Sequence, residues 1–352
     1  MELHEILKAA HELGASDIHL VAGHPPAARV HTVVQSIPNA PKLTAEDVRS
    51  FVQGMASKEA LARFEEIKDA DFSFAAEGLG RYRVNAHQQR NSVAIAMRTV
   101  KTKVPPLAKL TLPEVITKLT YLPRGLVLVT GDTGSGKSTT LAAMIQAMNE
   151  REAKHIITLE DPIEYTFKSE KCLIEQRELG ADMPSFASAL KHALRQDPDI
   201  ILVGEMRDLE TTALAITAAE TGHLVLSTLH TSSAAQTVDR IIDMYPGGQQ
   251  NQIRSMLSNT LQAVISQTLF PRLDQAGMVP GVEILLATPA VRNLIREART
   301  FEIPNVIETS RAMGMQTLDH CISQLFFNGM ISREDAIGAS AHPDRLSKRL
   351  AA

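Results

Sequence analysis

Residues 131–138 combine glycines, a lysine and a serine at a spacing that can bind phosphate groups. The segment matches the pattern G-x-x-x-x-G-K-[ST] in full. Glycines allow backbone N–H groups to turn inward, Lys137 can reach the β- and γ-phosphates, and the Ser138 hydroxyl can ligate magnesium. The predicted phosphate-binding residues are Thr133, Gly134, Ser135, Gly136, Lys137, Ser138 and Thr139.

This glycine-rich segment lies between a predicted strand and a predicted helix, as a phosphate-binding loop requires. Apolar and β-branched residues at 125–130 predict a buried strand before it, and residues 139–148 predict a helix after it. The N-terminus of that helix adds a partial positive charge where the phosphates would lie. The order strand, loop, helix makes a chance match in a glycine-rich turn a poor explanation.

An acidic segment follows the strand predicted at 155–159. It reads Glu-Asp-Pro-Ile-Glu over residues 160–164, and loops that leave the carboxyl ends of parallel strands face the ligand crevice. Carboxylates there can polarise a water molecule or support magnesium, and the proline helps to hold Glu164 in place. In isolation, the same five residues fit a solvated acidic turn equally well.

A second acidic segment ends the strand predicted at 199–203. An apolar strand that ends in an acid is typical of a Walker B element, but Gly204 occupies the usual aspartate position and leaves Glu205 as the charged group. We expect Glu205 to act on magnesium, directly or through water. The alternative is that this acid caps a helix ahead of Asp208.

Two histidines bracket the strand predicted at 223–228. A histidine beside apolar residues is more often a core or capping group, and for His223 both interpretations stay open. His230 lies past the carboxyl end of the strand, where a group that senses the γ-phosphate would lie. A functional role is therefore favoured for His230.

Phosphoryl transfer also needs positive charge near the transferred group, and an arginine is a common source. The candidates are Arg81, Arg83 and Arg98, which lie on neighbouring strands predicted before residue 100. The alternative is that they are solvent-facing strand charges, which is the commoner role of a single arginine. Their catalytic role gains support if this domain packs over a neighbouring subunit's nucleotide.

Composition restricts the classes of function. The chain has 352 residues, 44% hydrophobic and 22% charged, as expected for about two globular domains. A net charge of −4 with ten Phe, four Tyr and no Trp argues against a nucleic-acid partner. Two cysteines exclude a four-cysteine metal site. The acidic first residues predict no secretory signal and no run of eighteen apolar residues occurs, so we expect a cytoplasmic protein with peripheral membrane association at most.

The hydrophobic pattern predicts an α/β chain in four parts. Residues 1–100 predict a small α/β domain, and the polar, proline-broken residues 101–123 predict a linker. Residues 124–288 alternate strands and helices, which implies crossover connections and a largely parallel sheet. Residues 289–352 predict a helical C-terminal region.

Together these segments resemble the secretion ATPases of type II and type IV pilus systems, and among them the pilus retraction motors. The resemblance extends over nearly the whole chain. The segments that carry it are residues 14–20, 81–86, 130–140, 160–164, 197–208, 221–231, 290–297 and 314–319.

The resemblance implies a PAS-like N-terminal domain, a RecA-like P-loop ATPase core and a homohexameric ring. It implies ATP and Mg²⁺ as cofactors, with ATP between the two domains and touched by arginines of the first one. Glu164 matches the family's catalytic glutamate, and Glu205 matches its Walker B acid. His223 and His230 match its histidine box. Such a ring would drive pilus retraction and twitching motility through an inner-membrane platform protein, at the cytoplasmic face of that membrane.

Several alternatives and departures accompany this resemblance. An extension or type II secretion ATPase usually has a longer N-terminal region and often a four-cysteine metal site, neither of which this chain has. An accessory paralogue of the retraction motor and a nucleotide-binding regulatory subunit without turnover stay open. Asp132 replaces the usual proline and adds a negative charge near the phosphates. Arg292, Arg296 and Arg299 recur at helical spacing and fit either a solvated surface or a partner contact.

Overall fold

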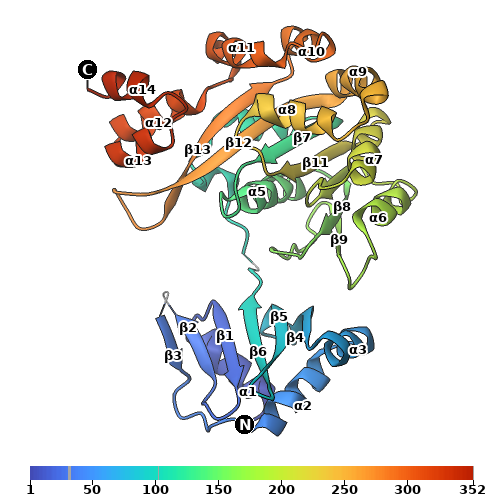
Figure 1. The fold of residues 1–352 in the computed structure, drawn as a ribbon, viewed down its shortest axis with the longest axis vertical. Helices are drawn as coiled ribbons and strands as arrows, with labels where there is room; N and C mark the ends of the chain where they lie inside the picture. The colour runs from blue at the N-terminus through green and yellow to red at the C-terminus, as the bar shows by residue number, and fades with distance from the viewer. Residues whose placement is uncertain (31–32, 102, 352) are drawn as a thin grey trace. The chain divides into compact units, whose positions relative to one another are not determined.

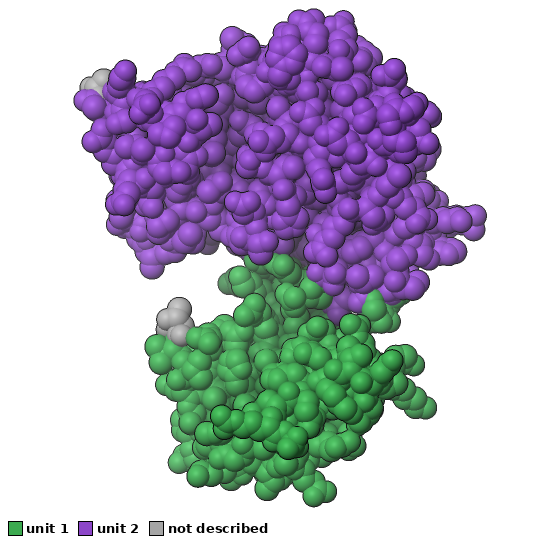
Figure 2. Space-filling model, viewed as in Figure 1, with its two compact units in different colours: residues 1–103, 162–166, 180–182 green, residues 104–161, 167–179, 183–352 purple. Residues whose placement is uncertain are grey.

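The computed structural model describes residues 1–30, 33–101 and 103–351, and it forms two compact units (Figure 1). Figure 2 shows which residues belong to each unit. Unit 1 comprises residues 1–103, 162–166 and 180–182, and unit 2 comprises the rest of the chain. Among the described residues, no helix is long and apolar enough to cross a membrane.

Unit 1 is built on a six-stranded antiparallel sheet in the order β3-β2-β1-β6-β5-β4. Its strands are β1 (Asp17–Val21), β2 (Ala27–Val30), β3 (Val33–Ser36), β4 (Asp69–Ala76), β5 (Gly80–Gln89) and β6 (Ser92–Thr99). Its helices are α1 (Leu3–Glu12), α2 (Ala45–Met55) and α3 (Lys58–Ile67).

The two faces of this sheet differ in polarity because side chains alternate along each strand. On β5, Tyr82 and Val84 are buried in one hydrophobic core with Ile6 of α1 and Phe51 of α2. The neighbouring positions of β5 include Arg83, which is exposed on the opposite face. The helices therefore cover one face, and the other face presents polar side chains.

Unit 2 is built on a seven-stranded sheet in the order β13-β12-β7-β11-β10-β8-β9, with all strand pairs parallel except β12–β13. Five of its strands coincide with apolar runs that predict them, counting the run at 282–286 within β13, and the four parallel ones are buried along most of their length, as expected for parallel strands covered on both faces. The strands are β7 (Gly125–Thr130), β8 (His155–Glu160), β9 (Leu173–Glu178), β10 (Ile200–Val203), β11 (Leu224–Leu229), β12 (Leu261–Pro271) and β13 (Met278–Leu286).

Helices cover both faces of the unit 2 sheet (Figure 1). One hydrophobic core lies under α6 (Phe186–Ala193), α7 (Leu209–Glu220), α8 (Ala234–Asp243), α9 (Gln250–Thr260), α10 (Pro289–Arg296) and α11 (Ile303–Thr309). The other core lies under α4 (Glu114–Leu119), α5 (Lys137–Asn149), α12 (Leu318–Phe327), α13 (Arg333–Gly338) and α14 (Pro343–Arg349). Short 3-10 helices complete the unit: η1 (Leu107–Lys109), η2 (Gly247–Gln249), η3 (Thr300–Glu302) and η4 (Arg311–Met313).

The stretch expected to be a linker, residues 101–123, differs from that expectation. Thr102 lies outside the described residues. Beyond it, η1 and α4 bury the side chains of Leu107, Ile116 and Leu119 in the core beneath α5. Prolines break this segment into short pieces, but its apolar side chains make it part of unit 2 from residue 104 onward.

Candidate active site

The carboxyl ends of four adjacent parallel strands bring the predicted site residues of unit 2, except His223, to one edge of its sheet. The order β7-β11-β10-β8 places the phosphate loop after β7, His230 after β11 and Glu205 after β10. Glu160 is the last residue of β8 at the same edge. Because loops at this edge of a parallel sheet border the ligand crevice, these groups can act on one ligand.

The phosphate loop uses the backbone conformations for which its glycines are suited. Gly131, Gly134 and Gly136 have φ values of 136°, 82° and 89°, in the region that residues with a Cβ rarely adopt. Lys137 is 8% exposed, and its Nζ donates hydrogen bonds to the carbonyl oxygens of Gly131 (2.7 Å) and Asp132 (2.8 Å). The lysine ammonium is therefore held over the loop, where phosphate oxygens would bind.

Asp132, which departs from the family pattern, contributes to this arrangement through its backbone. Its carbonyl oxygen accepts from Lys137 and also from the N–H of Ser135 (3.2 Å). The residue itself is exposed. A proline at this position is therefore not required for the loop geometry.

Strand β12, which the sequence pattern did not predict, contacts the phosphate loop and the end of β7. On β12, the Ser266 hydroxyl lies 2.9 Å from the Thr130 hydroxyl at the end of β7. The next residue, Gln267, makes hydrogen bonds to both Ser135 and Thr140. No local motif marks Ser266 or Gln267, because they lie about 130 residues beyond the loop in the chain.

Glu205 is 9% exposed and has two cationic or titratable neighbours. Its Oε2 lies 2.6 Å from Arg207 Nε and 3.5 Å from His230 Nε2. The glycine before it permits close strand packing, because an added Cβ on Gly204 would lie 3.1 Å from the Leu159 carbonyl oxygen of β8. The strand geometry thus disfavours a side chain at 204 and leaves the carboxylate of Glu205 at the sheet edge.

The acidic segment at 160–164 divides between the two units. Glu160 is held within unit 2, where its Oε1 accepts from the Thr158 hydroxyl (2.7 Å) and from Gln176 Nε2 (3.1 Å). Glu164 is exposed and belongs to unit 1, where its carbonyl oxygen accepts from the Lys101 N–H at 3.3 Å. Its catalytic role stays a prediction.

His223 lies at the opposite edge of the unit 2 sheet from the phosphate loop. It precedes β11, and its Nδ1 lies 2.9 Å from the Ala218 carbonyl oxygen near the end of α7. β11 contains six residues, so the two edges are roughly 20 Å apart at about 3.3 Å per residue. Within one subunit, the structure therefore does not bring His223 together with Lys137, and the contact with Ala218 gives it a structural partner.

The three candidate arginines lie on the polar face of the unit 1 sheet. Arg83 on β5 is directly opposite Arg98 on β6, which in turn is opposite Asp17 on β1. Arg81 lies two residues before Arg83 on the same strand, and it is partly buried. The three side chains therefore share one face, as expected from strand alternation.

Arg98 already has a partner on this face. Its Nε donates to Asp17 Oδ1 at 2.8 Å, and Arg29 Nε lies 3.8 Å from Asp17 Oδ2. Burial acts to raise the pKa of Asp17, but hydrogen bonds from Arg98 and Ser16 outweigh it, so the pKa lies below its ordinary value. Asp17 is thus a carboxylate that orders two arginines on this face.

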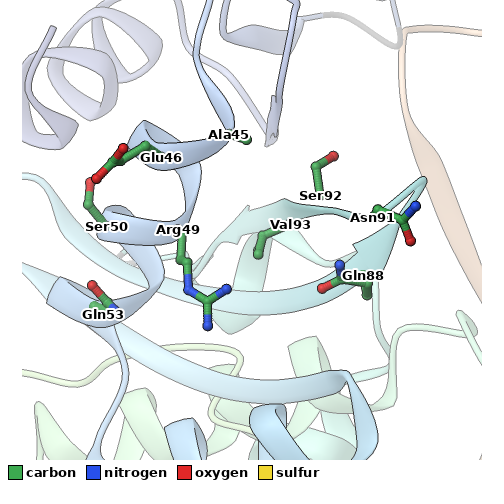
Figure 3. Close-up of a pocket in the computed structure, with 9 residues that line it drawn as sticks. All are labelled: Ala45, Glu46, Arg49, Ser50, Gln53, Gln88, Asn91, Ser92 and Val93. Carbon is green, nitrogen blue, oxygen red and sulfur yellow. The ribbon is translucent and has the colours of Figure 1, made fainter.

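A pocket in unit 1 lies away from these predicted residues (Figure 3). Its volume is about 350 Å³, and it lies between α2 and the hairpin of β5 and β6. Arg49 reaches into this region, and its Nη2 lies 2.8 Å from Glu65 Oε1. The nine lining residues include none of the predicted catalytic or phosphate-binding groups.

Comparisons with known proteins show that this chain is similar to secretion and pilus ATPases. Residues 2–317 match the family model described as "Type II/IV secretion system protein". The chain is 49% identical to the type IV pilus retraction ATPase PilT of Pseudomonas aeruginosa, over 96% of this chain and 97% of that one. It is 48% identical to a twitching motility protein of Neisseria gonorrhoeae, over 92% of this chain and 86% of that one.

Among solved structures, the chain is similar to a crystal structure of the pilus retraction motor PilT with bound ADP. The TM-score is 0.92 and the identity 46%, with 99% of each chain covered. The predicted α/β class is confirmed: both chains combine an N-terminal antiparallel sheet domain with an ATPase core on a largely parallel sheet and C-terminal helices.

Proposed function

The chain belongs to the type II/IV secretion system protein family as an ATPase homologous to pilus retraction motors, and from this premise we propose that it powers retraction of a type IV pilus as a magnesium-dependent hexameric ring. The observation that carries the proposal is the convergence of Lys137, Glu205 and His230 at one sheet edge. A site that only recognised phosphate would not need Glu205 and His230. Hydrolysis, in contrast, requires control of charge at the metal and at the γ-phosphate.

In this proposal, the loop from Thr133 to Thr139 holds the phosphates of ATP. The loop amides and the Lys137 ammonium bind phosphate oxygens, and the N-terminus of α5 adds its partial positive charge. His230 senses the γ-phosphate from the end of β11. Because Glu205 holds Arg207 and His230 on one oxygen, a change at the γ-phosphate can reach both.

The residues present fit a magnesium ion that is shared with the nucleotide. Ser138 in the first turn of α5 and Glu205 at the end of β10 supply oxygen ligands. Among residues 1–30, 33–101 and 103–351, no group of three or more His, Cys, Asp or Glu could hold a metal alone. This small ligand set agrees with the preference of Mg²⁺ for one or two protein oxygens together with phosphates and water. When bound, the ion would neutralise charge on the phosphates.

Glu164 orients or deprotonates the attacking water in this proposal, and Arg81, Arg83 and Arg98 stabilise charge on the transferred phosphoryl group. These four residues belong to unit 1, and positive charge and a water-positioning acid are the groups that phosphoryl transfer requires besides the phosphate loop. The ring would act on an inner-membrane platform protein at the cytoplasmic face of that membrane. The names of the relatives refer to pilus retraction and to twitching motility, which supports an assignment to the pilus machinery.

Phosphate release from Mg-ATP, measured on the full chain, tests the proposal. We expect Lys137→Ala to lose nucleotide binding, and Glu164→Gln to keep binding but lose turnover. Lys191→Ala, which changes an exposed lysine of α6, is the control and should behave as the wild type. Wild-type turnover in Glu164→Gln would refute its catalytic role, and binding without phosphate release in the unaltered chain would indicate a regulatory subunit.

A further inference from the structure

Gln267 is a buried glutamine on β12 whose side chain reaches the phosphate loop. It is 3% exposed. Its Nε2 donates to the Ser135 carbonyl oxygen at 2.7 Å, and its Oε1 accepts from the Thr140 hydroxyl at 2.8 Å. One side chain thus joins the phosphate loop to the first turns of α5, from a strand that lies beside β7.

Only one orientation of this amide satisfies both partners. The Ser135 carbonyl can only accept a hydrogen bond, so the amide nitrogen of Gln267 must face it. The amide oxygen then faces Thr140, whose hydroxyl can donate. Burial makes each of these bonds costly to break, because no bulk water is there to replace them.

The backbone of β12 packs against the loop as closely as its side chain does. A Cβ added to Gly131 would lie 2.2 Å from the Gln267 carbonyl oxygen. A Cβ added to Gly136 would lie 2.7 Å from Gln267 Nε2. The first and last glycines of the loop are therefore needed for its contact with this residue, as well as for their positive φ values.

We infer that Gln267 is a positioning residue, which aims the Gly136 N–H at the phosphates by fixing the Ser135 carbonyl. The two groups belong to one planar trans peptide and point in opposite directions. Holding the carbonyl toward β12 turns the N–H away from β12, toward the inner side of the loop. This inference rests on the proposed nucleotide site and adds a residue to it that touches neither metal nor phosphate.

Two substitutions separate this role from general packing. Gln267→Met keeps the length of the side chain but removes both hydrogen bonds. Gln267→Glu keeps the acceptor for Thr140 but places a carboxylate oxygen against the Ser135 carbonyl, until protonation supplies a donor. Gln262→Met is the matched control: it changes a glutamine on the same strand whose amide oxygen accepts from Arg292 instead (3.3 Å).

The experiment measures the affinity of the full chain for mant-ADP with Mg²⁺, and kcat and KM for ATP, between pH 6 and pH 8. Thermal unfolding of each variant reports stability. For Gln267→Met we expect mant-ADP affinity about ten-fold weaker and KM raised more than kcat is lowered. For Gln267→Glu we expect a loss at pH 8 that recovers relative to the wild type as the pH falls to about 6, because burial raises the pKa of a carboxyl group.

Affinity and KM within two-fold of wild type in Gln267→Met, or equal losses in Gln267→Met and Gln262→Met, would overturn the inference. If Gln267→Met does not fold, Gln267→Glu decides, because a pH-independent deficit contradicts a role for the donated hydrogen bond. A wild-type chain that binds no mant-ADP would instead remove the proposed function, so the two failures are distinguishable.

Discussion

His230 Nε2 lies 3.5 Å from Glu205 Oε2, and this contact joins the ends of two neighbouring parallel strands. Glu205 follows β10 and His230 follows β11, next to the strand that leads into the phosphate loop. The carboxylate is largely buried, whereas the side chains of Arg207 and His230 are 69% and 48% exposed. Arg207 and His230 are therefore free of tight packing and can move toward a ligand.

Replacing Glu205 by glutamine should abolish turnover and preserve nucleotide binding. The amide keeps the shape of the side chain but cannot carry the negative charge that pairs with Arg207 and faces His230. We expect kcat for ATP to fall by about 100-fold or more, as for loss of a preorganised charge at a reacting centre. Phosphate release and mant-ADP binding measure the two effects. Glu210→Gln on the exposed first turn of α7 is the control, and a two-fold loss at Glu205 would contradict its role.

The contact between His230 and Glu205 predicts that substitutions there are not independent. His230→Ala alone should lower kcat with little change in mant-ADP affinity. The double variant His230→Ala with Glu205→Gln should be no slower than Glu205→Gln alone, because the second change removes a partner that is already lost. Additive losses in ΔΔG‡ for ATP turnover would show that the two residues act separately.

Two loop glycines with positive φ should differ in their tolerance of alanine. A Cβ at Gly131 meets the Gln267 backbone at 2.2 Å, whereas a Cβ at Gly134 has no atom within 4 Å. We expect Gly131→Ala to lower the free energy of unfolding by about 3 kcal/mol through overpacking. Gly134→Ala should cost about 1 kcal/mol, from backbone strain alone. Urea unfolding without nucleotide measures both, and equal losses would argue against close packing by β12.

Glu283 on β13 predicts a pH dependence of stability. Burial raises the pKa of the Glu283 carboxyl above its ordinary value, and the charge of Asp319 adds to the increase. The carboxylate also accepts a hydrogen bond from the Ala234 N–H at 2.8 Å, which lowers the pKa but does not cancel the increase. The folded chain therefore binds this proton more tightly than the unfolded chain, and stability falls as the pH rises above about 4.3, toward the higher folded pKa.

Glu283→Gln should remove that loss, because the amide oxygen can still accept from Ala234 and carries no charge. We expect a higher melting temperature than wild type at pH 8 and converging values near pH 4. Glu297→Gln is the control: hydrogen bonds from Arg299 and Asn293 lower the pKa of Glu297, so this change should give no stabilisation at pH 8. A wild-type advantage over Glu283→Gln at pH 8 would show that the charge itself is stabilising.

Arg292 and Arg296 of α10 and Arg299, which follows that helix, do not form the uniform basic face that their spacing indicates. Arg292 Nη1 donates to the carbonyl oxygens of Ser258 and Asn259, the latter at 2.8 Å, and so caps the end of α9. Arg299 pairs instead with Glu297 (2.9 Å) and Glu302 (2.7 Å). We expect Arg292→Met to lower the free energy of unfolding by about 1–3 kcal/mol and Arg299→Met to change it little. Thermal and urea unfolding compare the two, and equal effects would contradict the capping role.

Local residue order was sufficient to predict the phosphate loop and many elements around it. Residues 131–138 define the loop because glycine conformation, the lysine and the serine act within eight residues. Thr44 and Asp47, three residues apart, have the spacing of a capping box, and the box is present: the Asp47 N–H donates to the Thr44 hydroxyl, and the Asp47 carboxylate accepts from the Thr44 N–H. Fully buried parallel strands such as β7 are recognisable because they appear as continuous apolar runs.

Tertiary structure alone decided which groups meet. Strand β12 had no counterpart among the predicted elements, because its apolar residues follow α9 directly, without a turn residue between Thr260 and Leu261. The roles of Gln267 and of the Glu205–His230 contact depend on which strands are neighbours, and His223 is distant from Lys137 because the two ends of β11 lie at opposite sheet edges. A phosphate loop depends on residues within one short segment, so a local pattern predicts it. Strand order and register arise from packing between residues far apart in the chain, which no local pattern encodes.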